Sequence, residues 1–89
     1  MTKKVLLSTR AQKDYKKLSK SMKKRVKEGL TRLSEGDEGL DIKKLKGVGG
    51  REDLYRLRIG DHRIVYFPEK STIKVIRIDR RDKIYDWLE

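Results

Sequence analysis

The sequence predicts an α+β fold in which an N-terminal strand and a helical hairpin pack on an antiparallel sheet, in the order β-α-α-β-β-β. Apolar residues recur every three or four positions over residues 11–33, which is the period of one helix face. Residues 54–59 and 62–67 alternate apolar and polar side chains, which is the period of a half-buried strand. The length of 89 residues predicts a single domain over residues 1–89.

The N-terminal third predicts a short strand at residues 4–7 and then helical structure. Ser8 or Thr9 provides a hydroxyl that caps the first free backbone N–H groups of a helix. Ser19 and Ser21 interrupt the polar flank of the apolar stripe. We therefore expect two antiparallel helices joined by a tight turn instead of one long helix. The stripe consists of Ala11, Tyr15, Leu18, Met22, Val26, Leu30 and Leu33.

The remainder of the chain predicts strands separated by turns. The glycine-containing stretch 35–39 ends the helical hairpin. The two alternating segments enclose Gly60-Asp61, a two-residue hairpin signal. The turn at residues 68–71 leads into a third strand at residues 73–78.

The composition is polar for a globular protein, at 35% hydrophobic and 44% charged residues, and this raises the possibility of disorder. Disorder is disfavoured because the apolar residues fall in periodic runs. No run approaches the roughly 20 apolar residues that span a bilayer, and the first ten residues lack a long apolar core. We therefore expect a soluble, cytoplasmic protein that does not bind membranes.

Cysteine is absent and His62 is the one histidine of the sequence. This excludes a disulfide framework, a thiolate zinc site, a cysteine nucleophile and any mechanism that needs two histidines. We expect no metal and no cofactor. His62 falls on the predicted core-facing side of its strand, beside a turn, which favours a structural role.

The net charge of +11 indicates a polyanionic partner, with nucleic acid the first candidate and an acidic protein or membrane surface the others. The helices contribute a large share of the lysines. These lysines form either a solvated face or a surface that binds nucleic acid, and the sequence leaves both interpretations open. They are Lys13, Lys16, Lys17, Lys20, Lys23, Lys24 and Lys27.

Alternation in the two central strands brings three arginines to one face of the sheet. If the apolar faces pack on the helices, Arg56, Arg58 and Arg63 meet on the open face. Arg81 and Lys83 follow the last strand and extend the same surface. A cluster of guanidinium groups binds phosphate through charge and bidentate geometry. The alternative is a solvated sheet face whose charges promote solubility.

Three segments together resemble the RelE/ParE toxin superfamily: residues 44–47 (KLKG), 54–66 (LYRLRIGDHRIVY) and 81–85 (RDKIY). The predicted hairpin and strand order agree with that fold, so the resemblance covers nearly the whole chain. It implies the toxin of a type II toxin–antitoxin system, and more narrowly a RelE-like mRNA interferase. Such enzymes are metal-independent endoribonucleases, often acting on mRNA at the ribosome, in which a 2′-hydroxyl attacks the adjacent phosphate.

The resemblance also implies roles for individual residues. Arg63 matches the phosphate-binding arginine, Arg81 the arginine that stabilises or protonates the leaving group, and Tyr85 the tyrosine that orients the substrate or acts as base. Arg56 and Arg58 replace lysines of the RelE pattern, and arginine does not readily lose a proton. A lysine-base role therefore does not transfer to them, although both still bind phosphate. The other RNA-binding candidates are Lys44, Lys46 and Lys83.

Other interpretations stay open for these residues. Arg63 and Arg81 have carboxylate neighbours in the sequence that would form structural ion pairs: Asp61, Asp79 and Asp82. Tyr85 would otherwise pack against the helical hairpin. Trp87 has the chemistry to stack on a nucleobase, but its position beside Leu88 favours packing at a core edge.

Two other functions compete with RNA cleavage. One is a ParE-like inhibitor that binds DNA gyrase and has no nuclease activity, and the other is a non-catalytic RNA-binding module. The presence of Arg63, Arg81 and Tyr85 favours the RelE-like function, because ParE-like members generally lack this set. In either toxin interpretation the resemblance implies a cognate antitoxin. For a RelE-like toxin it is RelB-like, and the charge of the chain predicts that its binding segment is acidic.

Overall fold

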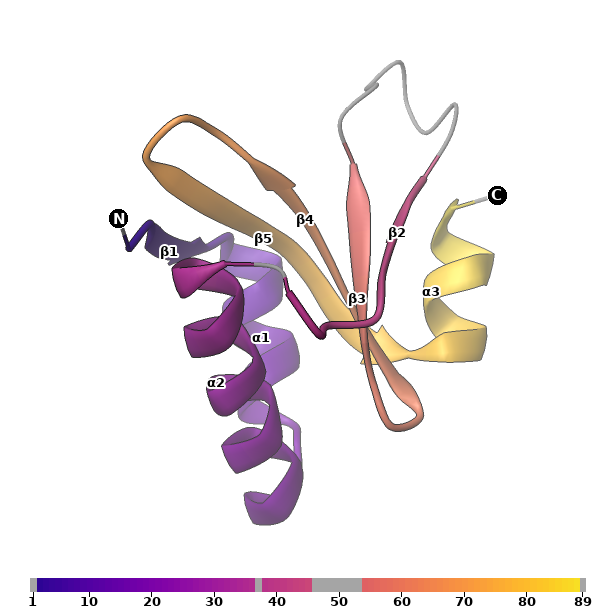
Figure 1. Cartoon of the computed structure of the whole chain (residues 1–89). Helices are drawn as coiled ribbons and strands as arrows, with labels where there is room; N and C mark the ends of the chain where they lie inside the picture. Colours follow the sequence, from indigo (N-terminus) through magenta and orange to yellow (C-terminus); the bar gives the residue numbers. More distant parts are fainter. Residues whose placement is uncertain (1, 37, 46–53, 89) are drawn as a thin grey trace.

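The computed structural model describes residues 2–36, 38–45 and 54–88, with the backbone alone at 85–88. It has an N-terminal strand, two helices, four further strands and a C-terminal helix (Figure 1). The elements are β1 (Lys4–Leu7), α1 (Thr9–Lys16), α2 (Lys20–Glu35), β2 (Ile42–Lys44), β3 (Tyr55–Ile59), β4 (His62–Pro68), β5 (Thr72–Arg80) and α3 (Arg81–Leu88).

The helical hairpin confirms the prediction, including both of its caps. The Ser8 hydroxyl accepts a hydrogen bond from the Ala11 N–H at 3.0 Å and begins α1. The Ser19 hydroxyl accepts one from the Met22 N–H at 3.2 Å and begins α2. Each hydroxyl satisfies a backbone donor that has no partner within the first helical turn.

The five strands form one sheet in the order β1-β5-β4-β3-β2. The α+β class is confirmed, but β1 runs parallel to β5, so the sheet is mixed and not wholly antiparallel. The short strand β2 is an additional edge strand, antiparallel to β3. The predicted hairpin between β3 and β4 turns at Gly60, whose φ of +57° is a conformation that favours glycine.

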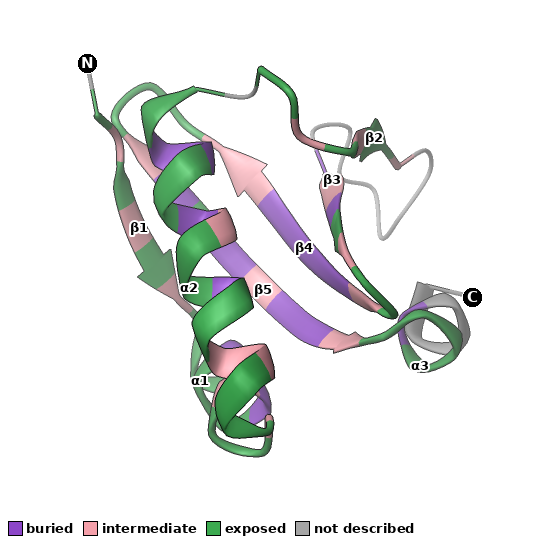
Figure 2. Ribbon diagram, turned by 60° about the horizontal axis from the view of Figure 1, so that its bottom comes forward, coloured by how far each residue is buried: buried purple, intermediate pink, exposed green. Residues whose placement is uncertain are grey.

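Helices α1 and α2 cover one face of the sheet, which we call the helix face, and the main core lies beneath them (Figure 2). The strands contribute Leu57, Ile64 and Ile78, each at most 1% exposed. Helix α2 contributes Val26 and Leu30 from the stripe that the sequence predicts. Burial of this apolar surface is the main stabilising contribution to the fold.

Helix α3 packs on the opposite face of the sheet over a smaller apolar cluster. Ile84 of α3 contacts Leu54 and Val65, and all three are at most 2% exposed. Figure 1 shows α3 separated from α1 and α2 by the sheet. The face opposite the main core is thus partly covered, whereas the sequence predicted it to be open.

Helix α1 is held to β5 by a buried carboxylate. Asp14 accepts hydrogen bonds from the Ile78 N–H at 3.0 Å and from Arg77 Nε at 3.2 Å. Strand β1 pairs with β5 only as far as Val75, so Asp14 provides the acceptor that a neighbouring strand would provide at Ile78. Arg77 Nη2 also donates to Asp79 Oδ2 at 2.9 Å, which gives the buried guanidinium two carboxylate partners.

Candidate functional site

Three arginines lie together on the face opposite the helix face, which we call the arginine face. Arg58 of β3 is directly opposite Arg63 of β4, and Arg56 is opposite Val65. Their neighbours Leu57 and Ile64 point into the main core. The predicted grouping of Arg56, Arg58 and Arg63 on one face is therefore confirmed.

The Arg63 side chain is buried at the end of the sheet beside the β3–β4 turn. The residue is 7% exposed, and its Nη1 donates to the carbonyl oxygens of Gly60 and His62, at 3.0 Å each. Its Nε is buried and has no hydrogen-bond partner among the described residues. Within the same part of the chain, no carboxylate forms an ion pair with Arg63, so the ion-pair alternative is not observed for this residue. A buried cation with a free donor is costly unless an anion binds it.

The start of α3 is attached to the same turn. The Arg81 N–H donates to the Asp61 carbonyl oxygen at 2.9 Å, and both Arg81 and Lys83 are exposed. The fold thus brings the backbone of Arg81 to the turn that fixes the Arg63 guanidinium. The backbone of Tyr85 lies in α3, and its side chain is outside the described part of the structure.

Arg56 and Arg58 share one carboxylate, that of Asp41. Arg56 Nη1 is 3.0 Å from Asp41 Oδ1, and Arg58 Nη1 is 3.6 Å from Asp41 Oδ2. The hydrogen bond from Arg56 lowers the pKa of Asp41 below its ordinary value, and the charges of Arg56, Arg58 and Arg63 add to this effect. Arg56 and Arg58 are therefore joined through one carboxylate on the arginine face.

The pairing of β2 with β3 places the two lysines of β2 on opposite faces of the sheet. Lys44 is opposite Tyr55, whose ring packs against the main core, so Lys44 lies on the helix-face side. Lys43 is opposite Arg56 and extends the arginine face, a position that sequence reasoning missed because it did not predict β2. Lys46 lies outside the described residues.

His62 lies at the start of β4 on the helix-face side, as the sequence predicts. Its Nδ1 is buried and has no hydrogen-bond partner within the described structure. Burial lowers the pKa of His62, because the protonated imidazole is poorly solvated there. This position directs the imidazole away from the arginine face and agrees with a structural role.

The sequence matches the family described as "ParE toxin of type II toxin-antitoxin system, parDE" over residues 5–85. It is also 36% identical over 88 residues to Toxin RelE3 of Methanocaldococcus jannaschii, covering 94% of this chain and 97% of that protein. The chain belongs to the RelE/ParE toxin superfamily. It is a RelE-family toxin of a type II toxin–antitoxin system, as the resemblance implies.

Solved structures of other RelE proteins have the same fold. The RelB–RelE antitoxin–toxin complex of Methanococcus jannaschii matches with a TM-score of 0.77 and 30% identity, over 94% of this chain and 99% of that chain. The RelE–RelB complex of Pyrococcus horikoshii matches with a TM-score of 0.72 and 31% identity, over 91% of this chain and 97% of that chain. Both matched proteins are complexes of a toxin with its antitoxin.

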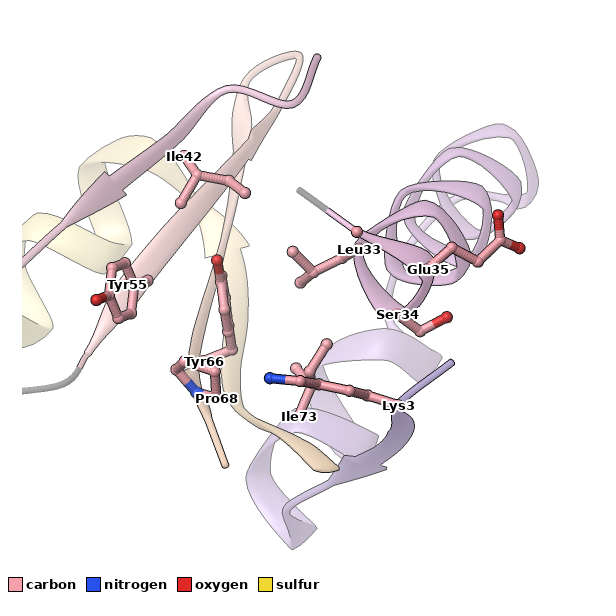
Figure 3. A pocket seen from close by; sticks show the side chains of 10 residues that line it. Lys3, Leu33, Ser34, Glu35, Ile42, Tyr55, Tyr66, Pro68 and Ile73 are labelled. Carbon is pink, nitrogen blue, oxygen red and sulfur yellow. The ribbon is translucent and has the colours of Figure 1, made fainter. Parts of the chain in front are cut away.

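The toxin also has a pocket of about 360 Å³ on the helix-face side, between the end of α2 and the sheet (Figure 3). Leu33 and Glu35 of α2 line one side, and Tyr55 and Tyr66 line the other. The two tyrosine rings are stacked with centroids 5.8 Å apart. The residues lining this pocket include no arginine, so the pocket is distinct from the arginine face.

The described residues contain neither a metal cluster nor a membrane-spanning helix. No group of three histidine, aspartate or glutamate side chains in this part of the toxin is arranged to hold a metal ion. No helix within it is long and apolar enough to cross a bilayer.

Proposed function

We propose that this toxin is a metal-independent endoribonuclease that cleaves mRNA at the ribosome. The observation that carries the proposal is the state of Arg63, a buried guanidinium with an unpaired Nε and no carboxylate partner among the described residues. A phosphate diester supplies the missing negative charge and the acceptor oxygens. The family membership supports the same function, because RelE-family toxins are generally mRNA interferases.

In the proposed reaction the 2′-hydroxyl of one nucleotide attacks the adjacent phosphate, and the bond to the 5′-oxygen of the next nucleotide breaks. The products are a 2′,3′-cyclic phosphate and a 5′-hydroxyl. Arg63 binds the scissile phosphate and stabilises the charge that develops on it. Arg81 stabilises the negative charge on the leaving 5′-oxygen, which takes its proton from water, and Tyr85 orients the substrate or takes the 2′-proton.

The remaining basic residues bind the RNA backbone on either side of the cleaved bond. Arg56 and Arg58 hold phosphates on the arginine face, and the exposed Lys83, near the start of α3, extends this contact. The backbone contacts position the RNA without selecting its sequence. The other proposed RNA-binding lysines are Lys44, which lies on the helix-face side of β2, and Lys46, which lies outside the described residues.

The proposed protein partner is an acidic, RelB-like antitoxin. The net charge of +11 opposes compaction of the free chain, and an acidic segment bound to the arginine face would neutralise part of that charge. We expect co-expression with an acidic protein encoded beside the toxin to give a complex that resists separation at moderate salt. Absence of such a neighbour, together with no growth inhibition when the toxin is expressed alone, would contradict this assignment.

The test is incubation of mRNA with ribosomes and the purified toxin, with cobalt(III) hexammine replacing free magnesium and EDTA present. The inert ammine complex preserves ribosome charge neutralisation but offers no open position to a reacting oxygen. We expect new 5′ ends on the mRNA under these conditions. Cleavage that appears only after magnesium is restored would contradict the metal-independent mechanism.

The match to the ParE family favours one alternative, a gyrase inhibitor without nuclease activity. The same protein sample distinguishes the two functions in a DNA supercoiling assay. Inhibition of gyrase together with intact mRNA would support the alternative, whereas cleaved mRNA and unaffected gyrase support the proposed nuclease.

A further inference from the structure

Asp41 is placed between two arginines of the arginine face, both from β3. Its carboxylate contacts Arg56 Nη1 at 3.0 Å and lies 3.6 Å from Arg58 Nη1. About half of the Asp41 and Arg58 side chains is exposed, at 52% and 56%, whereas the Arg56 side chain is only 15% exposed. The pair of guanidinium groups is thus already neutralised in part by a group of the toxin itself.

We propose that Asp41 occupies the position of an RNA backbone phosphate between Arg56 and Arg58, so that bound RNA displaces its carboxylate. This inference rests on the proposed function and adds that Asp41 limits the affinity of the toxin for RNA. A carboxylate and a phosphate both present two oxygens to a guanidinium group, so they compete for the same donors.

Displacement is feasible because the carboxylate is not needed to hold the strands. The Asp41 carbonyl oxygen accepts the Arg58 N–H at 2.9 Å and Arg56 Nη1 at 3.3 Å, and neither contact involves the carboxylate. The lowered pKa of Asp41 keeps the carboxylate charged at neutral pH, so the competition persists there.

The surroundings of Asp41 favour an incoming anion. Asp41 and Arg58 line an open cavity of about 330 Å³, to which α2 contributes Arg25 and Arg32 on the same wall as Glu28. Three arginines against two carboxylates give this cavity a net positive charge. The cavity extends toward α2 at the edge of the sheet, so its charge adds to the positive potential beside Arg58, while the displacing phosphate binds between Arg56 and Arg58 on the arginine face.

The test measures binding of a single-stranded RNA with 2′-O-methyl groups, which has no free hydroxyl for cleavage. We expect Asp41→Asn to bind this RNA about two- to fivefold more tightly than wild type, the range expected for removing an exposed competing ion pair. The slope of log affinity against log salt should become steeper by about 0.7, because one more positive charge of the protein is then free to neutralise an RNA phosphate. Asparagine keeps an acceptor oxygen for Arg56 and removes only the charge.

Glu69→Gln is the matched control. Glu69 forms an exposed ion pair with Lys74 at 3.1 Å, with 45% of its side chain exposed, at the β4–β5 turn. This variant raises the net charge by the same amount, so it should leave both the affinity and the salt slope close to wild type. Equal gains in both variants would mean that net charge alone sets the affinity, which overturns the inference.

Two further measurements separate competition at the arginine pair from binding elsewhere and from a protein ligand. The gain from Asp41→Asn should vanish in a protein that also carries Arg56→Gln and Arg58→Gln, and persistence of the gain would overturn the inference. Tighter binding of poly-glutamate without tighter binding of RNA would overturn it in favour of an acidic protein ligand. The cleavage assay tests the proposed function independently. If Asp41→Asn leaves RNA binding unchanged in a toxin that still cuts mRNA, only the role of Asp41 is refuted. If the wild-type toxin does not cut mRNA, the proposed function is refuted.

Discussion

The two faces of the sheet are built from the same strands but contain different chemistry. Among the described residues, ten buried side chains form one continuous apolar cluster on the helix face, under α1 and α2. On the arginine face, the buried apolar cluster has three described residues, Leu54, Val65 and Ile84, and Arg63 is buried on the same side. Burying a guanidinium opposes folding, whereas burying an aliphatic side chain favours it.

This contrast explains how a small, highly charged toxin remains folded. Burial of apolar side chains on the helix face stabilises the fold. This stabilisation offsets the cost of burying the Arg63 guanidinium on the arginine face. The other buried guanidinium, Arg77, is compensated by Asp14 and Asp79 within the chain. Arg63 has no such carboxylate among the described residues, so its desolvation is offset only by two carbonyl contacts until an anion binds.

The largest expected effect on stability is on the helix face. Ile64 is fully buried in the main core, and Ile64→Ala should lower the free energy of unfolding by about 2–5 kcal/mol. Urea unfolding followed by circular dichroism measures this loss. The rate of mRNA cleavage per folded molecule should stay near that of wild type, and a selective loss of that rate would mean that the two faces are not separate in function.

Arg63, the residue before Ile64 in β4, should affect the cleavage rate more than the stability. Arg63→Ala should lower the cleavage rate by about 10²–10³-fold, because it removes a fixed donor to the phosphate. The free energy of unfolding should change less than in Ile64→Ala, since the substitution also removes a costly buried charge. Arg63→Lys should restore only part of the rate, because the planar donor pair is lost. Full activity in Arg63→Ala would place the chemistry elsewhere.

The smallest effect concerns His62, on the helix-face side beside the β3–β4 turn. Burial and the charges of Arg80 and Arg25 lower its pKa, while Asp79 and Asp61 raise it. Above the ordinary pKa of 6.5 the imidazole is neutral in both the folded and unfolded chains. Below it the unfolded chain binds the proton first, so stability should fall as the pH decreases through the lowered pKa.

Urea midpoints at about pH 7.5 and about pH 5.5 test this expectation, because carboxyl groups with their ordinary pKa values titrate mainly below this window. The decrease should be smaller in His62→Gln than in wild type. An identical decrease in both proteins would assign the pH dependence to other groups.

Much of the fold follows from local sequence patterns. The helical period and the serine caps are contained within single segments, so α1, α2 and the turn between them were predictable, whereas α3 was not predicted. Strand β2 has only three residues, too few to show a period, and its pairing with β3 depends on a distant segment. The parallel pairing of β1 with β5 is likewise a long-range contact with no local signal.

The arginine grouping in the site was predictable because it depends on the alternation of side chains along two neighbouring strands. Arg56, Arg58 and Arg63 follow a period of two across a recognisable turn, so their common face was evident. The contact of Asp41 with Arg56 spans 15 residues, and the Asp14–Arg77 ion pair spans 63. Charged residues of this kind look solvated in the sequence, because only the tertiary fold determines which of them become buried or paired.

The proposed reaction requires the 2′-hydroxyl next to the broken bond, and this requirement can be measured. An mRNA with a single 2′-deoxy nucleotide on the 5′ side of a mapped cleavage site is compared with its all-ribose counterpart. We predict that the all-ribose RNA yields a 2′,3′-cyclic phosphate and a 5′-hydroxyl, and that the deoxy RNA is not cut at that bond. Equal cleavage of both RNAs, or a 5′-phosphate on the product, would contradict the proposed reaction.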